Sequence, residues 1–204
     1  MSVKKRIAIF VSGSGTNMEN IARHVQTGKL LCDIVLVLCD NPNALALKRA
    51  QKLGLETCVV ERKNFSSKSE FDSAINEKLA AKKVEAIFLA GYMRIISPEF
   101  VRNWTWRIIN IHPSLLPKYP GAHSIKDAFE AKEKETGVTI HFVDEGIDSG
   151  PIILQKKVPI LPNDTIETLE ARVHETEYQL YPEAIKLWLD GKVIVRNNRV
   201  EVLN

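Results

Sequence analysis

The sequence has few of the features that mark secreted, membrane-spanning or zinc-binding chains. It contains only three cysteines, Cys32, Cys39 and Cys58, and no C-x-x-C pair, which argues against a disulfide framework or a zinc site. Nowhere do 18 apolar residues follow one another, and the apolar run after Lys4-Lys5-Arg6 is too short for the core of a signal peptide. We therefore expect small core cysteines in a reducing compartment and a cytoplasmic chain without a membrane partner.

Charge of one sign is also scarce. Lys and Arg number 28 against 25 for Asp and Glu, a net charge of +3, and the basic residues are scattered along the chain. This balance permits anionic small-molecule ligands but predicts no nucleic-acid partner, because proteins that bind nucleic acids gather basic residues on one face. The 204 residues are enough for a complete α/β core, so we expect a single domain over 1–204.

Buried strands alternate with amphipathic helices in the first half of the chain. Continuous apolar runs at 7–11, 34–39 and 84–90 are typical of strands covered on both faces, and 56–61 predicts a further short strand. This alternation predicts an α/β fold with a doubly wound, mostly parallel sheet of Rossmann-like type. Helices are predicted between the strands, from Met18 to Gly28, near 46–53, after a capping box at Ser67 and Glu70, and near 97–101.

The second half of the chain has a different pattern. A strand at 108–111 is followed by 113–136, which we interpret as a mobile loop with a charged helical stretch at 126–134. The strand at 138–143 alternates, with one apolar face, and is predicted to be antiparallel to 152–158, because their connection is too short for a crossover. Two elements follow: a long helix capped by Asp164 and Glu167 and kinked or divided at Pro182, and a small hairpin around Asn197-Asn198.

The segment from Ile108 to Ser114 is the strongest candidate for a catalytic strand end. Its apolar strand carries Asn110, and His112 stands just before Pro113, which ends the ladder because it has no N–H to donate. Side chains two residues apart on a strand project to the same face, so the amide and the imidazole can reach one substrate atom. The alternative is a capped strand end with a structural core histidine.

A glycine-rich turn, Ser12 to Asn17, lies between the first strand and the first predicted helix. Backbone N–H groups and the positive end of the helix dipole make such a turn a site for an anion. A dinucleotide site with Asp40 on the ribose is one alternative, but the G-x-G-x-x-G fingerprint would need glycine where Met18 stands. A single phosphate monoester fits the turn better, and a tight turn without a ligand is the remaining alternative.

Three polar strand ends are predicted to share one edge of the sheet: 13–17, 91–94 and 110–112. Ligands of open parallel sheets bind beyond the carboxyl ends of the strands, so this convergence favours a functional crevice. Asp148, in a glycine-flanked turn, is a further candidate, since its carboxylate can bond to an imidazole or a trapped water. Asp144 and Glu145 match neither a calcium loop nor another metal-ligand spacing, so no metal is expected.

Three motifs together make the chain similar to a known family. In chain order they are Ser12-Gly13-x-Gly15-Thr16-Asn17, then Asn110-x-His112-Pro113-Ser114-Leu115-Leu116-Pro117, then Gly137-x-Thr139-x-His141-Phe142-Val143 leading to Asp148-x-Gly150-Pro151-Ile152. This combination resembles the formyltetrahydrofolate-dependent formyltransferases over nearly the whole chain. Within that family the chain is most similar to the members that formylate glycinamide ribonucleotide in purine synthesis. The resemblance implies 10-formyltetrahydrofolate as co-substrate and no covalent enzyme intermediate.

The resemblance also implies roles for individual residues. Asn110 and His112 would stabilise an oxyanion, and Asp148 would hold His112 and assist proton transfer. The domain would consist of a phosphate-binding half at about 1–100 and a folate-binding and catalytic half at about 101–204. The substrate-binding residues implied are Gly13, Ser14, Gly15, Thr16, Asn17, Lys68 and Glu177, and the folate-binding residues are Met93, Arg94, Ile95, Ile96, Val143, Asp144 and Asp148.

Two of these residues are unusual in their setting. Glu177 is an acid on the apolar stripe of the long helix, and the resemblance assigns it to the ribose or the glycinamide amine. Lys68 stands where the family commonly has arginine, so it offers a point charge without a bidentate fork. Its contact with the phosphate or with a folate carboxylate is therefore left open.

Three alternatives remain. A methionyl-tRNA formyltransferase or a formyltetrahydrofolate deformylase would share the motifs, but the first normally adds a C-terminal domain and the second an N-terminal one, for which 204 residues leave no room. A non-catalytic nucleotide-binding module, responsive to NAD through Gly13, Gly15 and Asp40, would leave the grouping of Asn110 with His112 unexplained.

Overall fold

The computed structural model describes residues 4–203. Seven strands form a mostly parallel sheet in the order β3-β2-β1-β4-β5-β6-β7, and β8 and β9 form a second sheet. The predicted α/β class, with antiparallel strands toward the C-terminal half, is confirmed. The chain divides within β5 into a first unit, up to Ile109, and a second unit, from Asn110. A single functional domain over 1–204 stays a prediction.

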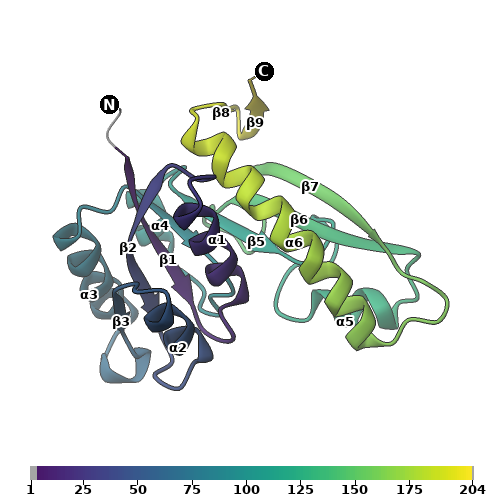
Figure 1. Ribbon diagram of the computed structural model, residues 1–204, viewed down its shortest axis with the longest axis horizontal. Helices are drawn as coiled ribbons and strands as arrows, with labels where there is room; N and C mark the ends of the chain where they lie inside the picture. The colour runs from purple at the N-terminus through teal and green to yellow at the C-terminus, as the bar shows by residue number, and fades with distance from the viewer. Residues whose placement is uncertain (1–3, 204) are drawn as a thin grey trace. The chain divides into compact units, whose positions relative to one another are not determined.

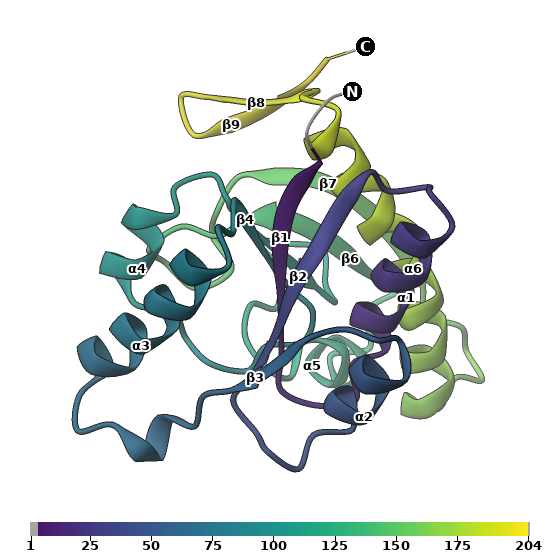
Figure 2. The same ribbon diagram turned by 60° about the vertical axis from the view of Figure 1, so that its left-hand side comes forward.

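The first unit has its strands between two groups of helices. β1 pairs in parallel with β2 and β4, and β2 with β3. Figure 2 shows α1 and α2 on one side of these strands and α3 and α4 on the other. Because both faces are covered, β1 is buried from Ile7 to Val11, as its continuous apolar run predicts. The elements are β1 (Lys5–Val11), α1 (Thr16–Gln26), β2 (Cys32–Cys39), α2 (Leu45–Lys52), β3 (Thr57–Val59), η1 (Arg62–Asn64), α3 (Lys68–Ala81), β4 (Ala86–Leu89), α4 (Pro98–Asn103) and the start of β5 (Ile108–His112).

The carboxyl ends of β1 and β4 are joined by hydrogen bonds. The backbone N–H of Ser12 donates to the carbonyl of Gly91 at 3.0 Å, and the hydroxyl of Ser12 accepts from the backbone N–H of Met93 at 2.8 Å. The predicted convergence is therefore confirmed for the segments that follow β1 and β4 in the first unit. The third segment, 110–112, belongs to the second unit, and its convergence with them stays a prediction.

The second unit packs one long helix on an antiparallel pair of strands. β6 pairs with β7, with Val138 opposite Lys156, and α6 lies along both strands (Figure 1). β8 and β9 form the predicted hairpin, whose turn residues Asn197 and Asn198 have φ values of 49° and 57°, as a two-residue hairpin turn requires. Besides the end of β5, the elements are α5 (Ser124–Glu130), β6 (Glu135–Phe142), β7 (Ile152–Pro159), α6 (Ile166–Leu189), β8 (Val193–Arg196) and β9 (Arg199–Val202).

Both capping predictions need correction. The N-cap of α6 is Thr165, which forms a reciprocal box with Thr168, and not Asp164. The Asp164 carboxylate is engaged by both terminal nitrogens of Arg172, at 2.7 Å each, and this bidentate ion pair competes with a capping role. At α3, Ser67 caps as predicted, but the side chain of Glu70, an acid of the first turn, bonds to Ser66, the residue before the cap, in place of closing a box.

Two further expectations differ from the structure, and a third is not tested by it. α6 continues through Pro182 as one helix, so the alternative of a second helical piece is wrong. β6 is buried on both faces from Thr136 to Phe142. Thr139 and His141 have internal hydrogen bonds, whereas the buried hydroxyl of Thr136 has no partner among residues 4–203. Segment 113–136 contains α5 and several buried side chains, and its mobility stays a prediction.

The cysteines largely follow expectation. Cys32 and Cys39 are buried in β2, whereas Cys58 is partly exposed. Burial raises the pKa of the Cys32 thiol to about 12, so this thiol is unreactive at neutral pH. In the part of the chain that the structure describes, no helix combines the length and apolar character needed to cross a membrane.

Candidate active site

The end of β5 presents an amide and an imidazole in the second unit. Asn110 and His112 lie two residues apart on the strand and therefore share a face. His112 is only 4% exposed, and Asn110 is partly exposed. A buried imidazole needs a partner for each ring nitrogen, so the contacts of His112 define what it can do.

Both ring nitrogens of His112 face oxygen atoms. Nε2 lies 2.8 Å from the carbonyl oxygen of Tyr119, and a carbonyl can only accept, so Nε2 carries a proton. Nδ1 lies 3.3 Å from Oδ2 of Asp148. Because both partners are oxygen acceptors, His112 can donate to both of them only when each ring nitrogen carries a proton.

A second buried histidine orients Asn110. His141 on β6 is 2% exposed, and its Nδ1 donates to the carbonyl of Phe142 at 2.8 Å. Burial lowers the pKa of His141 below its usual value, which keeps the ring neutral. Its Nε2 then accepts from the side-chain nitrogen of Asn110 at 3.1 Å. The Asn110 amide group is therefore held with its N–H groups toward the cluster.

Asp148 connects the two halves of this cluster. One carboxylate oxygen lies beside His112, and the other lies 3.4 Å from the Asn110 amide nitrogen. The backbone N–H of Gly121 donates to Asp148 at 2.8 Å. Asp148 has a φ of 50°, a left-handed conformation that costs energy for a residue with a side chain. This turn geometry directs the carboxylate toward β5.

The rest of the Gly137 to His141 motif shapes the chain just after His112. A Cβ atom on Gly137 would lie 2.3 Å from the side chain of Leu115, so only glycine leaves room for Leu115. The hydroxyl of Thr139 donates to the carbonyl of Ser114 at 2.7 Å and accepts from the backbone N–H of Leu116 at 3.2 Å. The motif thus holds the 113–116 segment in place.

His141 is the residue of the cluster to which sequence reasoning assigned no role. It was named there only as part of the third motif. Its position on β6 could have indicated a role, because it shares a strand face with Gly137 and Thr139, and the apolar Val138 and Ile140 lie on the other face. A polar residue at such a position of a strand that proves buried on both faces must have a buried partner.

The glycine turn of the first unit is open to a ligand. Gly15 is the N-cap of α1 with φ 75°, and no side chain caps this helix start. A Cβ atom on Gly15 would lie 2.6 Å from the Cβ of Ala46, so α2 packs closely behind the turn. Gly13 and Ser14 are exposed. The turn thus offers backbone N–H groups at a helix N-terminus, which suits a phosphate group.

The dinucleotide alternative loses support in the first unit. Met18 is fully buried against the glycine turn and fills the position at which the fingerprint needs glycine. Asp40, the candidate ribose acid, is 7% exposed and forms an ion pair with Arg94. The carboxylate is therefore already engaged by a cation of the same unit.

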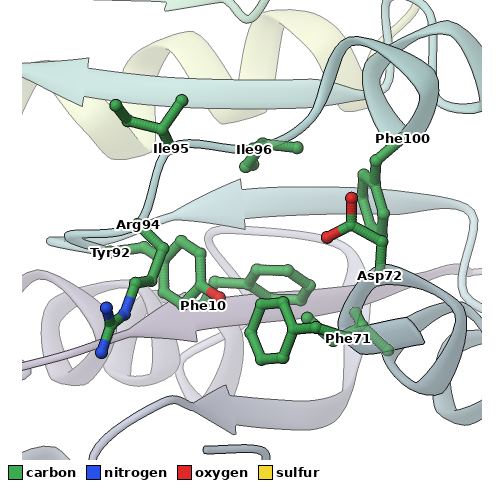
Figure 3. A pocket seen from close by; sticks show the side chains of 9 residues that line it. Phe10, Phe71, Asp72, Tyr92, Arg94, Ile95, Ile96 and Phe100 are labelled. Atoms are coloured by element: carbon green, nitrogen blue, oxygen red, sulfur yellow. The ribbon is translucent and has the colours of Figure 1, made fainter. Parts of the chain in front are cut away.

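The predicted folate segment exposes large apolar side chains. Met93 and Ile95 are 64% and 69% exposed, values unusual for such residues, while Ile96 is partly buried. Ile95, Ile96 and Arg94 line a small pocket with aromatic residues (Figure 3). Its interior of about 10 Å³ is at the lower limit for one water molecule. The exposed side of the segment is thus better suited to a ligand than this pocket.

The remaining predicted residues have distinct surroundings. Lys68 is the first residue of α3 and is exposed, although a cation at a helix N-terminus is unfavourable. Glu177 on α6 is 4% exposed and pairs with Nδ1 of His174 at 2.8 Å. The hydrogen bond that His174 donates to Glu177 raises the pKa of His174. Val143 and Asp144 are partly exposed, and Asp144 accepts local hydrogen bonds within its turn.

The buried cluster can donate hydrogen bonds and move a proton. We name Asn110, His112, His141 and Asp148 the β5–β6 cluster. It contains two N–H donors, a carboxylate and a neutral imidazole, which suit stabilisation of an oxyanion and proton transfer. Within residues 4–203, no group of three or more His, Cys, Asp or Glu side chains is arranged to hold a metal ion.

Comparison with known proteins places the chain in a family. The formyl transferase family profile matches residues 5–185. The chain is 44% identical over 194 residues to a phosphoribosylglycinamide formyltransferase of Haemophilus influenzae, covering 95% of this chain and 92% of that protein. It is 43% identical to the trifunctional purine biosynthetic protein adenosine-3 of Drosophila melanogaster, covering 94% of this chain but only 14% of that protein. The glycinamide ribonucleotide transformylase 1 structure of Symbiobacterium toebii has a TM-score of 0.97 at 38% identity and covers 100% of this chain and 96% of that one. The chain belongs to the formyl transferase family.

Proposed function

We propose that this chain transfers the formyl group of 10-formyltetrahydrofolate to the amine of glycinamide ribonucleotide, a step of purine biosynthesis. Support comes from membership of the formyl transferase family and from the near-complete overlap with the Haemophilus influenzae phosphoribosylglycinamide formyltransferase. The observation that carries the proposal is the β5–β6 cluster, because its donors and its carboxylate supply what amine attack on a formyl group needs. Both substrates are small molecules, and the formyl-folate is a co-substrate.

The reaction begins with attack of the substrate amine on the formyl carbon. A new N–C bond forms, the carbonyl oxygen becomes an oxyanion, and the C–N10 bond of the folate then breaks. Asn110 and a protonated His112 donate hydrogen bonds to the oxyanion, a class of contact worth about 2.7–4 kcal/mol per donor. The Tyr119 carbonyl oxygen, 2.8 Å from Nε2 of His112, marks the acceptor position that the oxyanion takes on this nitrogen.

Asp148 balances the protons of this reaction. The attacking amine must lose a proton, and N10 of the folate must gain one as it leaves. The carboxylate lies 3.3 Å from Nδ1 of His112 and assists this transfer directly or through water, a contribution of about 10²–10⁴-fold. The single ring proton of neutral His141 is directed to the carbonyl of Phe142, and its other ring nitrogen holds the Asn110 amide.

Binding of the two substrates is assigned to separate groups of residues. The phosphate of the ribonucleotide binds at the open helix start formed by 13–17, and Lys68 adds an exposed positive charge at the start of α3. Glu177 binds the ribose or the amine. The folate binds along 93–96, whose exposed apolar side chains need a cover, and along Val143 to Asp148.

Formyl transfer to glycinamide ribonucleotide by the purified protein tests this proposal. We expect turnover with 10-formyltetrahydrofolate, and loss of turnover in His112→Ala with an unchanged unfolding temperature. His24→Ala, which removes another partly buried imidazole far along α1, serves as the matched control and should stay active. Faster formylation of methionyl-tRNA, hydrolysis of the folate without an amine, or near-normal turnover of His112→Ala would contradict the proposal.

A further inference from the structure

An ion pair ties the predicted folate segment to the end of β2. Asp40 follows β2 directly, and Arg94 lies in the connection between β4 and α4. Nε of Arg94 donates to Oδ2 of Asp40 at 2.5 Å. The Asp40 side chain is 5% exposed, whereas the Arg94 side chain is 50% exposed. The buried carboxylate of Asp40 therefore holds the Nε end of the Arg94 guanidinium group, and half of the arginine side chain remains exposed.

Stability alone does not account for a carboxylate at this position. The second oxygen of Asp40, Oδ1, is buried and has no hydrogen-bond partner among residues 4–203. An unpaired buried oxygen of a charged group is costly, and a buried ion pair is weak grounds for stabilisation. What the pair does provide is a fixed position for the backbone that carries Arg94.

That backbone has only a few other attachments. The N–H of Met93 donates to the hydroxyl of Ser12 at 2.8 Å. The Tyr92 ring packs edge-on against Phe10, with centroids 5.2 Å apart, and Figure 3 shows Arg94 extending away from these rings. The side chains of Tyr92 and Arg94 attach the segment to the rest of the first unit. The apolar side chains of Met93 and Ile95, which follow each of them in the chain, are exposed.

We propose that Asp40 is a positioning residue for the folate co-substrate. Through its ion pair with Arg94 it sets the conformation of 93–96 and so determines how Met93 and Ile95 are presented to the ligand. Asp40 itself makes no contact with the ligand or the reacting atoms. This inference rests on the proposed function, which assigns 93–96 to the folate.

The test compares Michaelis constants for the two substrates. In Asp40→Ala we expect the KM for 10-formyltetrahydrofolate to rise about tenfold, as loss of a hydrogen bond between charged groups predicts. The KM for glycinamide ribonucleotide and kcat should stay within about twofold, since the ion pair holds the segment 93–96 that is assigned to the folate. Asp40→Asn keeps an acceptor oxygen and should recover most of the folate KM. Should Asp40→Ala fail to fold, Asp40→Ser is the second truncation.

A double variant shows whether Asp40 acts through Arg94. Adding Asp40→Ala to Arg94→Ala should raise the folate KM no further, because the partner is already gone. Glu56→Gln is the matched control, since it weakens another ion pair of the first unit, with Lys82 at 2.6 Å, and should leave the folate KM unchanged.

The outcomes separate this inference from the function on which it rests. A wild-type protein that transfers no formyl group contradicts the proposed function and the inference with it. An active wild type contradicts the inference alone if Asp40→Ala leaves the folate KM unchanged, shifts both KM values and kcat together, or adds its full effect to that of Arg94→Ala.

Discussion

The strand ends of the two units differ in how their polar groups are used. In the first unit, the turn after β1 leaves backbone N–H groups uncapped, and the segment after β4 exposes Met93 and Ile95. In the second unit, Asn110, His112 and Asp148 are largely buried and bond to one another. Open backbone donors and exposed apolar side chains suit binding, whereas a buried, mutually bonded cluster holds ionisable groups in a defined protonation state. The difference indicates that substrate binding depends on exposed groups, whereas the chemical step depends on buried groups that are bonded to one another.

The largest expected effect is on the chemistry of the second unit. Asp148→Asn keeps an acceptor for the backbone N–H of Gly121 but removes the negative charge beside His112. We expect kcat to fall by about 10²–10⁴-fold, with both KM values little changed. Steady-state kinetics with both substrates measure this. Asp127→Asn, an exposed carboxylate of α5, is the control, and an equal loss there would refute a special role for Asp148.

A glycine substitution tests the architecture of the first unit. Gly15→Ala combines an unfavourable φ of 75° with a Cβ only 2.6 Å from that of Ala46, so we expect a loss of about 2–4 kcal/mol in the free energy of unfolding. Gly28→Ala has a similar φ of 73° and open space, and should cost about 1–2 kcal/mol. Denaturant melts give both values. Equal losses would mean that α2 moves away from the new methyl group without a measurable loss in the free energy of unfolding.

The buried histidine predicts a pH effect on stability in the second unit. Burial lowers the folded-state pKa of His141 below 6.5, so the unfolded chain takes up a proton first as the pH falls. Stability is therefore complete above about pH 6.5 and decreases below it, by up to about 1.4 kcal/mol per pH unit. Denaturant melts at pH 7.5 and 5.5 measure this difference, which His141→Asn should reduce.

His174 provides a control of opposite sign. Its pKa is raised, chiefly by the hydrogen bond that it donates to Glu177, so its contribution is present below the unfolded pKa and is lost as the pH rises through the folded one. The ring is about half exposed, and the effect should stay below about 1 kcal/mol. The pH dependence that His174→Asn removes should therefore be opposite in sign to the one that His141→Asn removes, and the same sign in both variants would contradict these assignments.

The smallest expected effect concerns a hydroxyl of the first unit. Burial, with the charge of Asp40 second, raises the pKa of Tyr92 well above its usual range, and its hydroxyl has no partner within residues 4–203. Tyr92→Phe should therefore leave the free energy of unfolding unchanged or raise it by up to about 1 kcal/mol. A thermal melt measures this. Marked destabilisation would show that the hydroxyl has a bonding role, and the first unit would then resemble the second.

The strands and the turn motifs can be predicted from the sequence because they depend on residues close together in the chain. Continuous apolar runs predicted β1, β2 and β4, and the short connection between β6 and β7 predicted their antiparallel pairing. The N-cap residue of α6 cannot be predicted from the sequence, because Asp164 and Thr165 are both residue types that favour this position. A bidentate contact with Arg172, about two turns further on, decides between them.

Local sequence patterns are enough to predict the α/β alternation, the glycine turn and the strand end that carries Asn110 and His112, since periodicity and turn chemistry depend on consecutive residues. The partners of the buried groups follow from the packed chain: His141 for the Asn110 amide, the Tyr119 carbonyl for His112, and Arg94 for Asp40. These contacts join residues from 7 to 54 positions apart. Which buried polar groups meet across such separations depends on the packing of strands, and hydrogen bonding then selects the protonation state on which the proposed chemistry depends.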